Sequence, residues 1–532
     1  MLMAAETFSE QERRRLAPYF TNTDGPVFAL RNLPEVVKGA LFARYSRSAK
    51  SLRRLFLDEF LDQVEEQSGT AQVGVERADK LYERVFDEYG DDSVAQLGGA
   101  HLACEAASNL LTKVLEWGRL MAYLEQSTRY IAYNDRHGDR WKYLVPAELE
   151  QRAELRRRYT GCLDRAFETY ARWIEPMESY YRGKYPKDPG DPDGVYKRTI
   201  RAKALDTLRG LLPAATQSNV GLFGTGQAYE ALLLRMRVHP LEEVRTYADV
   251  MLIELRKVIP SFLKRVDRVD RGGRWSRYLQ ATLDSTEAAA EQVLAGTPSQ
   301  PRAEVTLTDY DPDGEVKVVG AALYAVSDLP DDQLLSIARG LSDDQRTAVL
   351  QAYVGTRENR RHKPGRAFER TTYRFDVLTD YGAFRDLQRH RLLTLEWQTL
   401  GPRHGYGVSG AIEDAGALPD WERVMQESAA LHDELVAGGL PDVAPYAVSM
   451  AYRVRFYMEM NAREAMHMIE LRTAPQGHPS YRRVCQAMHR LIADQAGHRA
   501  IAAAMSFTDH SEGELGRLRA ERASEQRRHG RS

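Results

Sequence analysis

Apolar residues recur at helical spacing along much of the chain. Two long stretches show this best, Asp91 to Leu120 and, after Pro240, Leu241 to Val269. Apolar positions three and four residues apart predict an amphipathic helix in each stretch.

Strand signals are fewer, and the clearest lies near the middle of the chain. The apolar stretches Glu304–Thr308 and Gly314–Val319 flank Asp311, Pro312, Asp313 and Gly314. Aspartate, proline and glycine in this order favour a tight turn, so the pattern predicts a hairpin of two strands.

Composition shifts mark the domain boundaries. The segment Ala295–Pro301 is rich in glycine, proline and serine, and it reads as a linker. A second punctuated segment, Tyr185–Gly194, reads as a surface loop. We expect one domain over residues 20–295, a second over 300–510, and a disordered tail over 511–532, where arginine and glutamate dominate.

The two sides of the linker resemble each other. The paired positions are Leu41-Phe42 with Leu323-Tyr324, Arg119 with Arg391, Leu212-Pro213 with Leu440-Pro441, and Arg237 with Arg472. The spacing falls from 272 residues at Arg119 and Arg391 to 235 at Arg237 and Arg472, so the first copy carries about 37 extra residues. The pattern indicates a tandem duplication.

Charge and cysteine content narrow the class of protein. With 74 basic and 76 acidic residues the chain lacks a global footprint for nucleic acid or membrane. No apolar run reaches the ~20 residues of a spanning helix, and the charged Met1–Phe20 stretch does not resemble a signal peptide. Cys104, Cys162 and Cys485 are far apart, which predicts neither disulfides nor a metal site. We expect a cytoplasmic protein.

Two polar motifs stand out in the second half. The first is Arg389-His390-Arg391, which alone is typical of a solvated surface. The second is the stretch Asn461–Arg472, which sets Asn461, Arg463, His467 and Arg472 among apolar residues at helical spacing. One interpretation is a helix with a polar face. The other is a wall for a flavin and a nucleotide, in which amides and imidazoles bind ring atoms and arginines bind phosphates.

Together the two motifs resemble the flavin-dependent thymidylate synthases. The resemblance covers Arg389, His390, Arg391 and the hydroxyl residue Thr399, followed by Asn461, Arg463, His467, Leu471 and Arg472 in register. It implies that Arg389, His390, Arg391, Asn461, Arg463 and His467 bind FAD, and that Arg472 holds and polarises the uracil of dUMP as the catalytic residue. It also implies NADPH and methylenetetrahydrofolate as co-substrates. The fold it implies is α+β and helix-rich, with helices packed on a small, mostly antiparallel sheet in each copy.

The two copies have lost different parts of the family pattern. After Thr399 the second copy continues with Leu400-Gly401-Pro402 in place of the expected arginine and tyrosine. The first copy keeps that loop as Glu125, Ser127, Arg129 and Tyr130. The resemblance assigns Glu125, Ser127 and Arg129 to the substrate, together with Arg389 and Arg472. It has lost the flavin residues, with Trp117-Gly118-Arg119 for the first motif and Gly226, Ala228 and Leu232 in the downstream helix, where only Arg237 remains.

These complementary losses predict one composite active site, with Ser127 and Arg129 across an interface from Arg389 and Arg472. The favoured function is FAD-dependent methyl transfer to dUMP. The alternatives are flavin-dependent methylation or hydroxymethylation of another pyrimidine nucleotide, and a pseudoenzyme that binds nucleotide or flavin without catalysis. Since the family assembles four units, a chain with two copies is expected to form a homodimer.

Overall fold

The computed structural model describes residues 7–23, 28–45, 50–65, 96–136, 138 and 140–511. The chain divides into two compact units. The first contains residues 1–105, 114–125 and 219–297, and the second contains residues 106–113, 126–218 and 298–532. In the described part of the chain no helix is long and apolar enough to cross a membrane. Apart from Ser511, the predicted disordered tail lies outside the described residues.

The first unit is built on a three-stranded sheet of order β1-β3-β2, whose strands β1 and β3 continue into residues assigned to the second unit. Strands β2 and β3 are antiparallel, with Met121 opposite Gly224 and Glu125 opposite Val220. Its elements are α1 (Glu10–Leu16), α2 (Glu35–Tyr45), α3 (Leu52–Glu59), α4 (Leu61–Glu65), β1 (Gly99–Ser108), β2 (Met121–Glu125), β3 (Gln217–Thr225), α9 (Gly226–Met236), α10 (Glu242–Arg256), the 3-10 turn Pro260–Leu263 and α11 (Gly272–Leu294). Helix α6 (Asn109–Leu115) is divided, because residues 109–113 belong to the second unit and residues 114–115 to the first.

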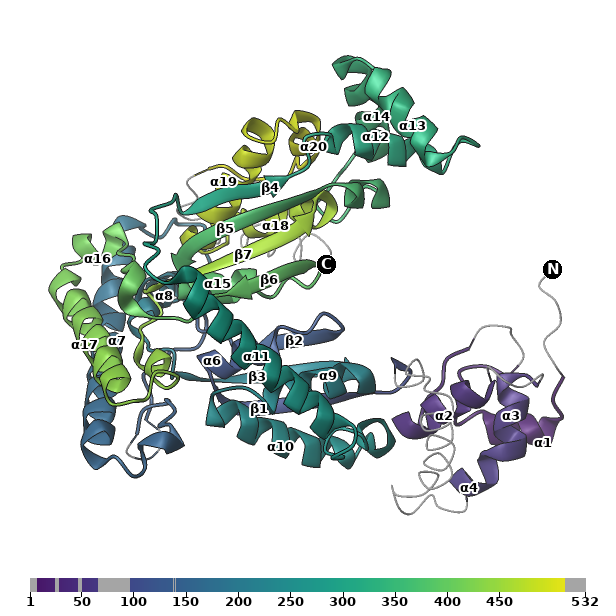
Figure 1. Cartoon of the computed structure of the whole chain (residues 1–532), viewed down its shortest axis with the longest axis horizontal. Helices are drawn as coiled ribbons and strands as arrows, with labels where there is room; N and C mark the ends of the chain where they lie inside the picture. The colour runs from purple at the N-terminus through teal and green to yellow at the C-terminus, as the bar shows by residue number, and fades with distance from the viewer. Residues whose placement is uncertain are drawn as a thin grey trace. The chain divides into compact units, whose positions relative to one another are not determined.

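The second unit is built on a four-stranded antiparallel sheet of order β4-β5-β7-β6 (Figure 1). Its strands are β4 (Val305–Tyr310), β5 (Thr372–Asp380), β6 (Leu393–Trp397) and β7 (Arg453–Asn461). Its helices are α7 (Ala153–Lys184), α8 (Asp193–Leu208), α12 (Gly314–Tyr324), α13 (Asp331–Gly340), α14 (Asp343–Val354), α15 (Tyr381–Leu387), α16 (Gly410–Asp414), α17 (Leu418–Ala437), α18 (Ala462–Arg472), α19 (Pro479–Asp494) and α20 (Arg499–Ala504). Short 3-10 turns cover Ala147–Leu149, Arg209–Leu211, Arg366–Arg370, Pro402–His404 and Ala444–Ala447.

One face of the four-stranded sheet forms the core of the second unit. Strand β5 buries Tyr373, Phe375 and Val377, which alternate with half-exposed residues as a pleated strand requires. Helices α15 and α19 pack against β5, and α18 packs against α19. On the opposite face Arg374 pairs across the strands with Glu459. The alternation explains why apolar residues recur at every second position along much of these strands.

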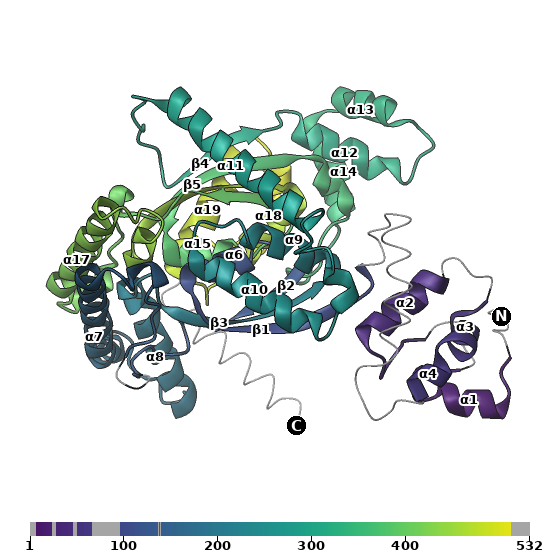
Figure 2. The same cartoon turned by 60° about the horizontal axis from the view of Figure 1, so that its bottom comes forward.

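Helices α7 and α17 lie side by side in the second unit, although they come from opposite halves of the sequence (Figure 2). Ion pairs run along their contact, including Arg165 with Glu427 and Arg172 with Asp420. The predicted boundary near residue 297 separates two segments of the chain, but residues 126–218 of the first copy fold with the second.

The duplication is visible in the order of elements. The first copy runs β1, α6, β2, β3, α9 and the second runs β5, α15, β6, β7, α18, and the corresponding strands take the same order in the two sheets. Helices α9 and α18 both have 11 residues and begin after capping side chains, Thr225 and Asn461. The predicted fold class, a helix-rich α+β unit present in two tandem copies, is therefore confirmed.

The structure corrects two of the paired positions. Since α9 and α18 start at Gly226 and Ala462, 236 residues apart, the counterpart of Arg472 is Met236 rather than Arg237. The counterpart of Pro213 is Ser449 rather than Pro441, because each lies four residues before the equivalent strand, β3 at Gln217 and β7 at Arg453. The spacing at the earlier helices α6 and α15 is 272 residues, so the first copy carries 36 extra residues, 272 minus 236.

Two helix and strand predictions were wrong, and a third was right only in part. Within Asp91–Leu120, residues 99–108 form β1 because pairing in the sheet overrides the helix propensity of alanine. The predicted second strand of the hairpin, Gly314–Val319, is the start of α12, which buries Val318, Val319 and Ala322 at helical spacing. The helix predicted over Leu241–Val269 ends at Arg256, shortly before Pro260 begins a 3-10 turn.

Candidate functional site

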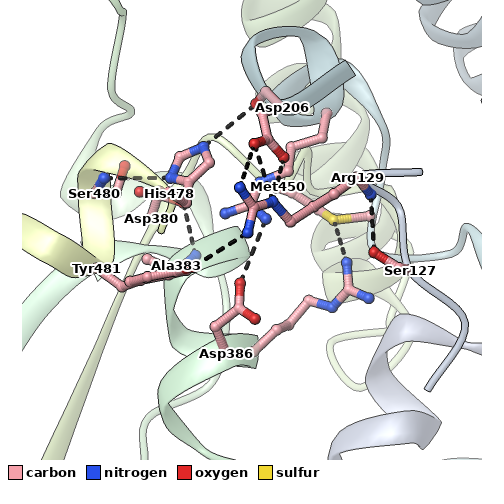
Figure 3. A network of polar contacts seen from close by, with 12 residues as sticks. Ser127, Arg129, Asp206, Asp380, Ala383, Asp386, Met450, His478, Ser480 and Tyr481 are labelled. Atoms are coloured by element: carbon pink, nitrogen blue, oxygen red, sulfur yellow. Dashed lines mark hydrogen bonds and ion pairs between the residues drawn. The ribbon is translucent and has the colours of Figure 1, made fainter. Parts of the chain in front are cut away.

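Arg129 lies in the loop after β2 and is held by a carboxylate of α8. Its guanidinium donates to Asp206 through Nε at 2.8 Å and through Nη2 at 2.7 Å, while Nη1 donates to the Tyr481 hydroxyl at 3.2 Å (Figure 3). The Ser127 hydroxyl accepts a hydrogen bond from the Arg129 backbone N–H at 3.3 Å, which fixes the turn of the loop. Burial raises the pKa of the Asp206 carboxyl, but the Arg129 guanidinium outweighs it and the pKa lies below its usual value.

A second carboxylate, Asp386 of α15, lies among arginines from both copies. It is 3.5 Å from Arg209, 3.6 Å from Arg472 and 3.8 Å from Arg389. Burial opposes ionisation of Asp386, yet the arginines hold its pKa well below the ordinary range. Asp386 therefore stays negative at every physiological pH and partly neutralises the cluster.

Arg472 is oriented by a buried histidine. Its Nε donates to Nε2 of His390 at 3.1 Å, and the other ring nitrogen of His390 lies 3.0 Å from a Glu464 carboxylate oxygen. Burial lowers the pKa of His390 to about 4, since Glu464 only partly opposes burial and the nearby Arg472 adds to it. His390 is therefore neutral at pH 7. A neutral ring that accepts at Nε2 carries its proton at Nδ1, and so donates to Glu464.

The same carboxylate contacts a second histidine. Nδ1 of His467 lies 3.4 Å from the other oxygen of Glu464, so ligand atoms of His390, Glu464 and His467 gather within 4.8 Å of one another. This is a spacing that a metal ion accepts. However, a metal at Nδ1 of His390 would place the ring proton on Nε2, against the Arg472 donor. The hydrogen bonds present thus favour a hydrogen-bonded chain from Glu464 through His390 to Arg472 over a metal site.

The residues assigned to flavin form a donor-rich surface around α18. Arg389, Arg463 and His467 each keep about a third of the side chain exposed, at 31%, 32% and 34%, and Arg391 is exposed. Guanidinium and imidazole donors suit the acceptor oxygens of a flavin ring and a pyrophosphate. The Asn461 side chain accepts from the Glu464 backbone N–H at 2.9 Å as the cap of α18, which leaves its amide N–H group to donate.

His390 fits this assignment less directly than its neighbours. It is buried, and both of its ring nitrogens have protein partners. The structure therefore gives it a contact to Arg472, and the predicted flavin contact of His390 gains no support from its geometry.

Two residues that the sequence analysis singled out in the first copy, Glu125 and Arg237, lie in the first unit and not in the second. Glu125, assigned to the substrate, is the last residue of β2 and is buried. Arg237 follows α9 and pairs with Asp249 at 3.5 Å.

A cavity of about 1040 Å³ opens in the second unit beside the arginine cluster. Arg129, Asp206 and Arg209 line it together with His478. Arg209 is 4% exposed, and its Nη2 has no hydrogen-bond partner in the described part of the chain. A buried guanidinium with an unused donor beside a cavity suits an anionic ligand.

Sequence reasoning missed four residues of this cluster: Asp206, Arg209, Asp386 and Glu464. Asp386 stands three residues before the Arg389-His390-Arg391 motif, Glu464 stands inside the Asn461–Arg472 motif, and Arg209 stands three residues before Leu212, so their positions were within reach. Asp206 gave no signal, because a single carboxylate outside any motif is usually a solvated charge.

Comparison with known proteins identifies the class. The sequence profile of the family described as thymidylate synthase complementing protein matches residues 39–261 and 306–496. The chain belongs to this family. The two matched segments fall on either side of the linker, as expected of a duplicated unit.

Relatives of two kinds are found. The chain is 38% identical to a protein of Chlamydia muridarum named UPF0159 protein, over 98% of this chain and 99% of the relative. A protein of Thermoplasma acidophilum named UPF0159 protein Ta1429 is 29% identical over 91% of this chain and 97% of the relative. A flavin-dependent thymidylate synthase of Clostridium tetani is 24% identical over 33% of this chain and 66% of its own length. One from Mycobacterium sp. (strain JLS) is 28% identical over 34% and 67%.

Proposed function

We propose that this protein transfers a one-carbon unit from methylenetetrahydrofolate to dUMP and reduces it to the methyl group of dTMP, with FAD as cofactor and NADPH as reductant. The observation that supports this most is the meeting of retained residues from both copies. Arg129 and Arg209 of the first copy and Arg389 and Arg472 of the second surround Asp386, and Arg129 and Arg209 also line a cavity large enough for a nucleotide.

The roles follow from charge and burial. Arg129 and Arg209 bind the nucleotide phosphate, because both line the cavity and one guanidinium nitrogen of Arg209 has no hydrogen-bond partner among the described residues. Arg472 holds the uracil where negative charge develops during attack by its C5 carbon. Arg389, Arg391, Asn461, Arg463 and His467 hold the flavin. Reduced flavin supplies the hydride, and the protein supplies positioning and charge.

The carboxylate of Asp206 bears on substrate affinity. Asp206 already forms a bidentate pair with Arg129, so a phosphate gains only the remaining donors of Arg129 unless it displaces Asp206. The alternative is a binding protein without catalysis. In that case nucleotide would bind, but turnover would be absent.

The test is release of tritium from dUMP labelled at C5, with flavin-loaded protein, methylenetetrahydrofolate and NADPH. We expect yellow protein and release that depends on all three components. Arg472→Ala should lower the rate about a hundred- to thousandfold if it resembles other donors that stabilise developing charge. Arg237→Ala is the matched control, because Arg237 pairs with Asp249 in the first unit, and it should leave the rate within about twofold.

The outcomes separate the alternatives. Flavin and dUMP binding without tritium release would contradict methyl transfer to dUMP and support a pseudoenzyme. Tritium release with another uridine or cytidine nucleotide, but not with dUMP, would support a different pyrimidine acceptor. Equal effects of Arg472→Ala and Arg237→Ala would contradict the role of Arg472.

A further inference from the structure

Glu464 is the one carboxylate of the cluster that contacts histidines rather than arginines. It lies in the first turn of α18, is 4% exposed, and is placed by Asn461, whose side chain accepts from its backbone N–H. Hydrogen bonds from His390 and His467 hold its pKa at about 2 despite the opposing effect of burial. Glu464 is therefore an anionic acceptor next to the ring of His390.

The ring of His390 connects Glu464 to Arg472. A neutral imidazole has one N–H, and the position of that proton is set by its partners. An anionic Glu464 at Nδ1 can only accept, so it draws the proton there and leaves the lone pair of Nε2 to accept from Arg472. With the proton on Nε2 the ring would present a donor to the Arg472 donor, and the hydrogen bond would be lost.

We propose that Glu464 is a positioning residue, which fixes the tautomer of His390 so that Nε2 accepts from Arg472 and holds its guanidinium in place for the base. This rests on the proposed function for the role of Arg472, but the tautomer itself does not depend on it. Asp386 constrains the same guanidinium from another side, at 3.6 Å from Nη1 of Arg472. Two fixed contacts leave Arg472 little freedom, and such preorganisation is what an electrostatic role requires.

The first experiment measures the tautomer in ligand-free protein. Nitrogen NMR of sedimented protein labelled with ¹⁵N-histidine distinguishes a protonated Nδ1 from a protonated Nε2, and His390→Gln identifies the His390 signals. We expect the proton on Nδ1 in the wild type and in Glu464→Gln, whose amide oxygen still accepts. In Glu464→Ala the signals should shift to the other tautomer or to a mixture.

The matched control is Glu470→Gln on the same helix. Glu470 is also buried, 1% exposed, and it pairs with Arg357, so its replacement perturbs α18 without touching His390. It should leave the His390 signals unchanged. An Nε2 proton in the wild type, or unchanged His390 signals in Glu464→Ala, would overturn the proposal whatever the protein catalyses.

The second experiment is a double-mutant cycle with His390→Gln, a variant that needs no particular histidine tautomer. The amide oxygen introduced by His390→Gln can accept from Arg472 without any help from Glu464. Glu464→Ala should weaken dUMP binding or slow turnover about tenfold, the effect of one hydrogen bond to a charged group. Glu464→Gln should restore most of the loss, and Glu464→Ala should have less than about a twofold effect in the His390→Gln background.

The cycle also distinguishes failure of the two proposals. Equal effects of Glu464→Ala in both backgrounds would show that Glu464 does not act through His390. A second outcome is that the wild type neither binds nor turns over dUMP, while its His390 carries the Nδ1 proton and loses it in Glu464→Ala. This outcome would contradict the proposed function and leave the tautomer assignment standing.

Discussion

The pair formed by Arg129 and Asp206 offers a sharp test of how the first copy's loop is held in the second unit. The side chains are 17% and 12% exposed, and the guanidinium reaches both carboxylate oxygens. Removing one partner of a buried pair leaves an uncompensated charge, which typically costs about 3–5 kcal/mol. We therefore expect Asp206→Ala to lower the free energy of unfolding of the second unit by about that amount.

Tryptophan fluorescence during urea unfolding measures this loss. Of the six tryptophans, Trp117 and Trp275 lie in the first unit, so replacing both by phenylalanine confines the signal to the second. Glu427→Ala is the control, because the exposed pair of Arg165 and Glu427 should contribute no more than about 1 kcal/mol. A loss in Asp206→Ala as small as that in the control would refute the burial of the pair.

Acid provides an independent check on the same carboxylate. The pKa of Asp206 is lower in the folded protein than in the unfolded chain, where it is about 3.9. The pair therefore stabilises the fold fully above that value and loses its contribution as the pH falls through the folded pKa. The stability difference between the wild type and Asp206→Asn should be constant from pH 5 to 7 and shrink below about pH 4.

Three further predictions concern other parts of the chain. Gly314→Ala should destabilise the second unit by about 1–3 kcal/mol in urea unfolding, because a Cβ would lie 2.3 Å from the ring of His498 and 2.5 Å from Thr371; no loss would mean that α12 starts differently. Burial raises the pKa of Cys162 and Cys485 to about 12, so neither thiol should react with iodoacetamide at pH 8 before unfolding, and mass spectrometry would detect any labelling. Light scattering should give a homodimer at micromolar concentration, and a monomer would contradict the assembly expected of a duplicated chain.

The sequence predicted the elements whose signal is local. The Asn461–Arg472 helix forms as predicted, with Asn461 as its cap, because capping and periodicity act within one turn. The duplication was also within reach, since equivalent motifs recur in the same order on both sides of the linker. The pairing of Arg237 with Arg472 was one residue out, because Met236 and Arg237 are adjacent and only the strand register decides between them.

The remaining features depend on contacts far apart in the chain. That residues 126–218 fold with the second copy is set by the packing of α7 on α17, which no local pattern reports. The carboxylates Asp206 and Asp386 are ordinary helix residues until the fold brings arginines to them. Burial of His390 was equally hidden, because Arg389 and Arg391 on either side are typical of a solvated surface.

The equivalent positions of the two copies determine how many such sites one chain can hold. Arg129 and Arg209 have Gly401 and Pro445 as their counterparts in the second copy, and Arg472 has Met236 in the first. A second site related by the duplication would therefore lack all three guanidinium groups, since glycine, proline and methionine have no charged side-chain donor for a phosphate or a uracil. We expect titration calorimetry to give one dUMP per chain. Two equivalent nucleotides per chain would mean that binding relies on residues other than these arginines, and would contradict the division of the site between the copies.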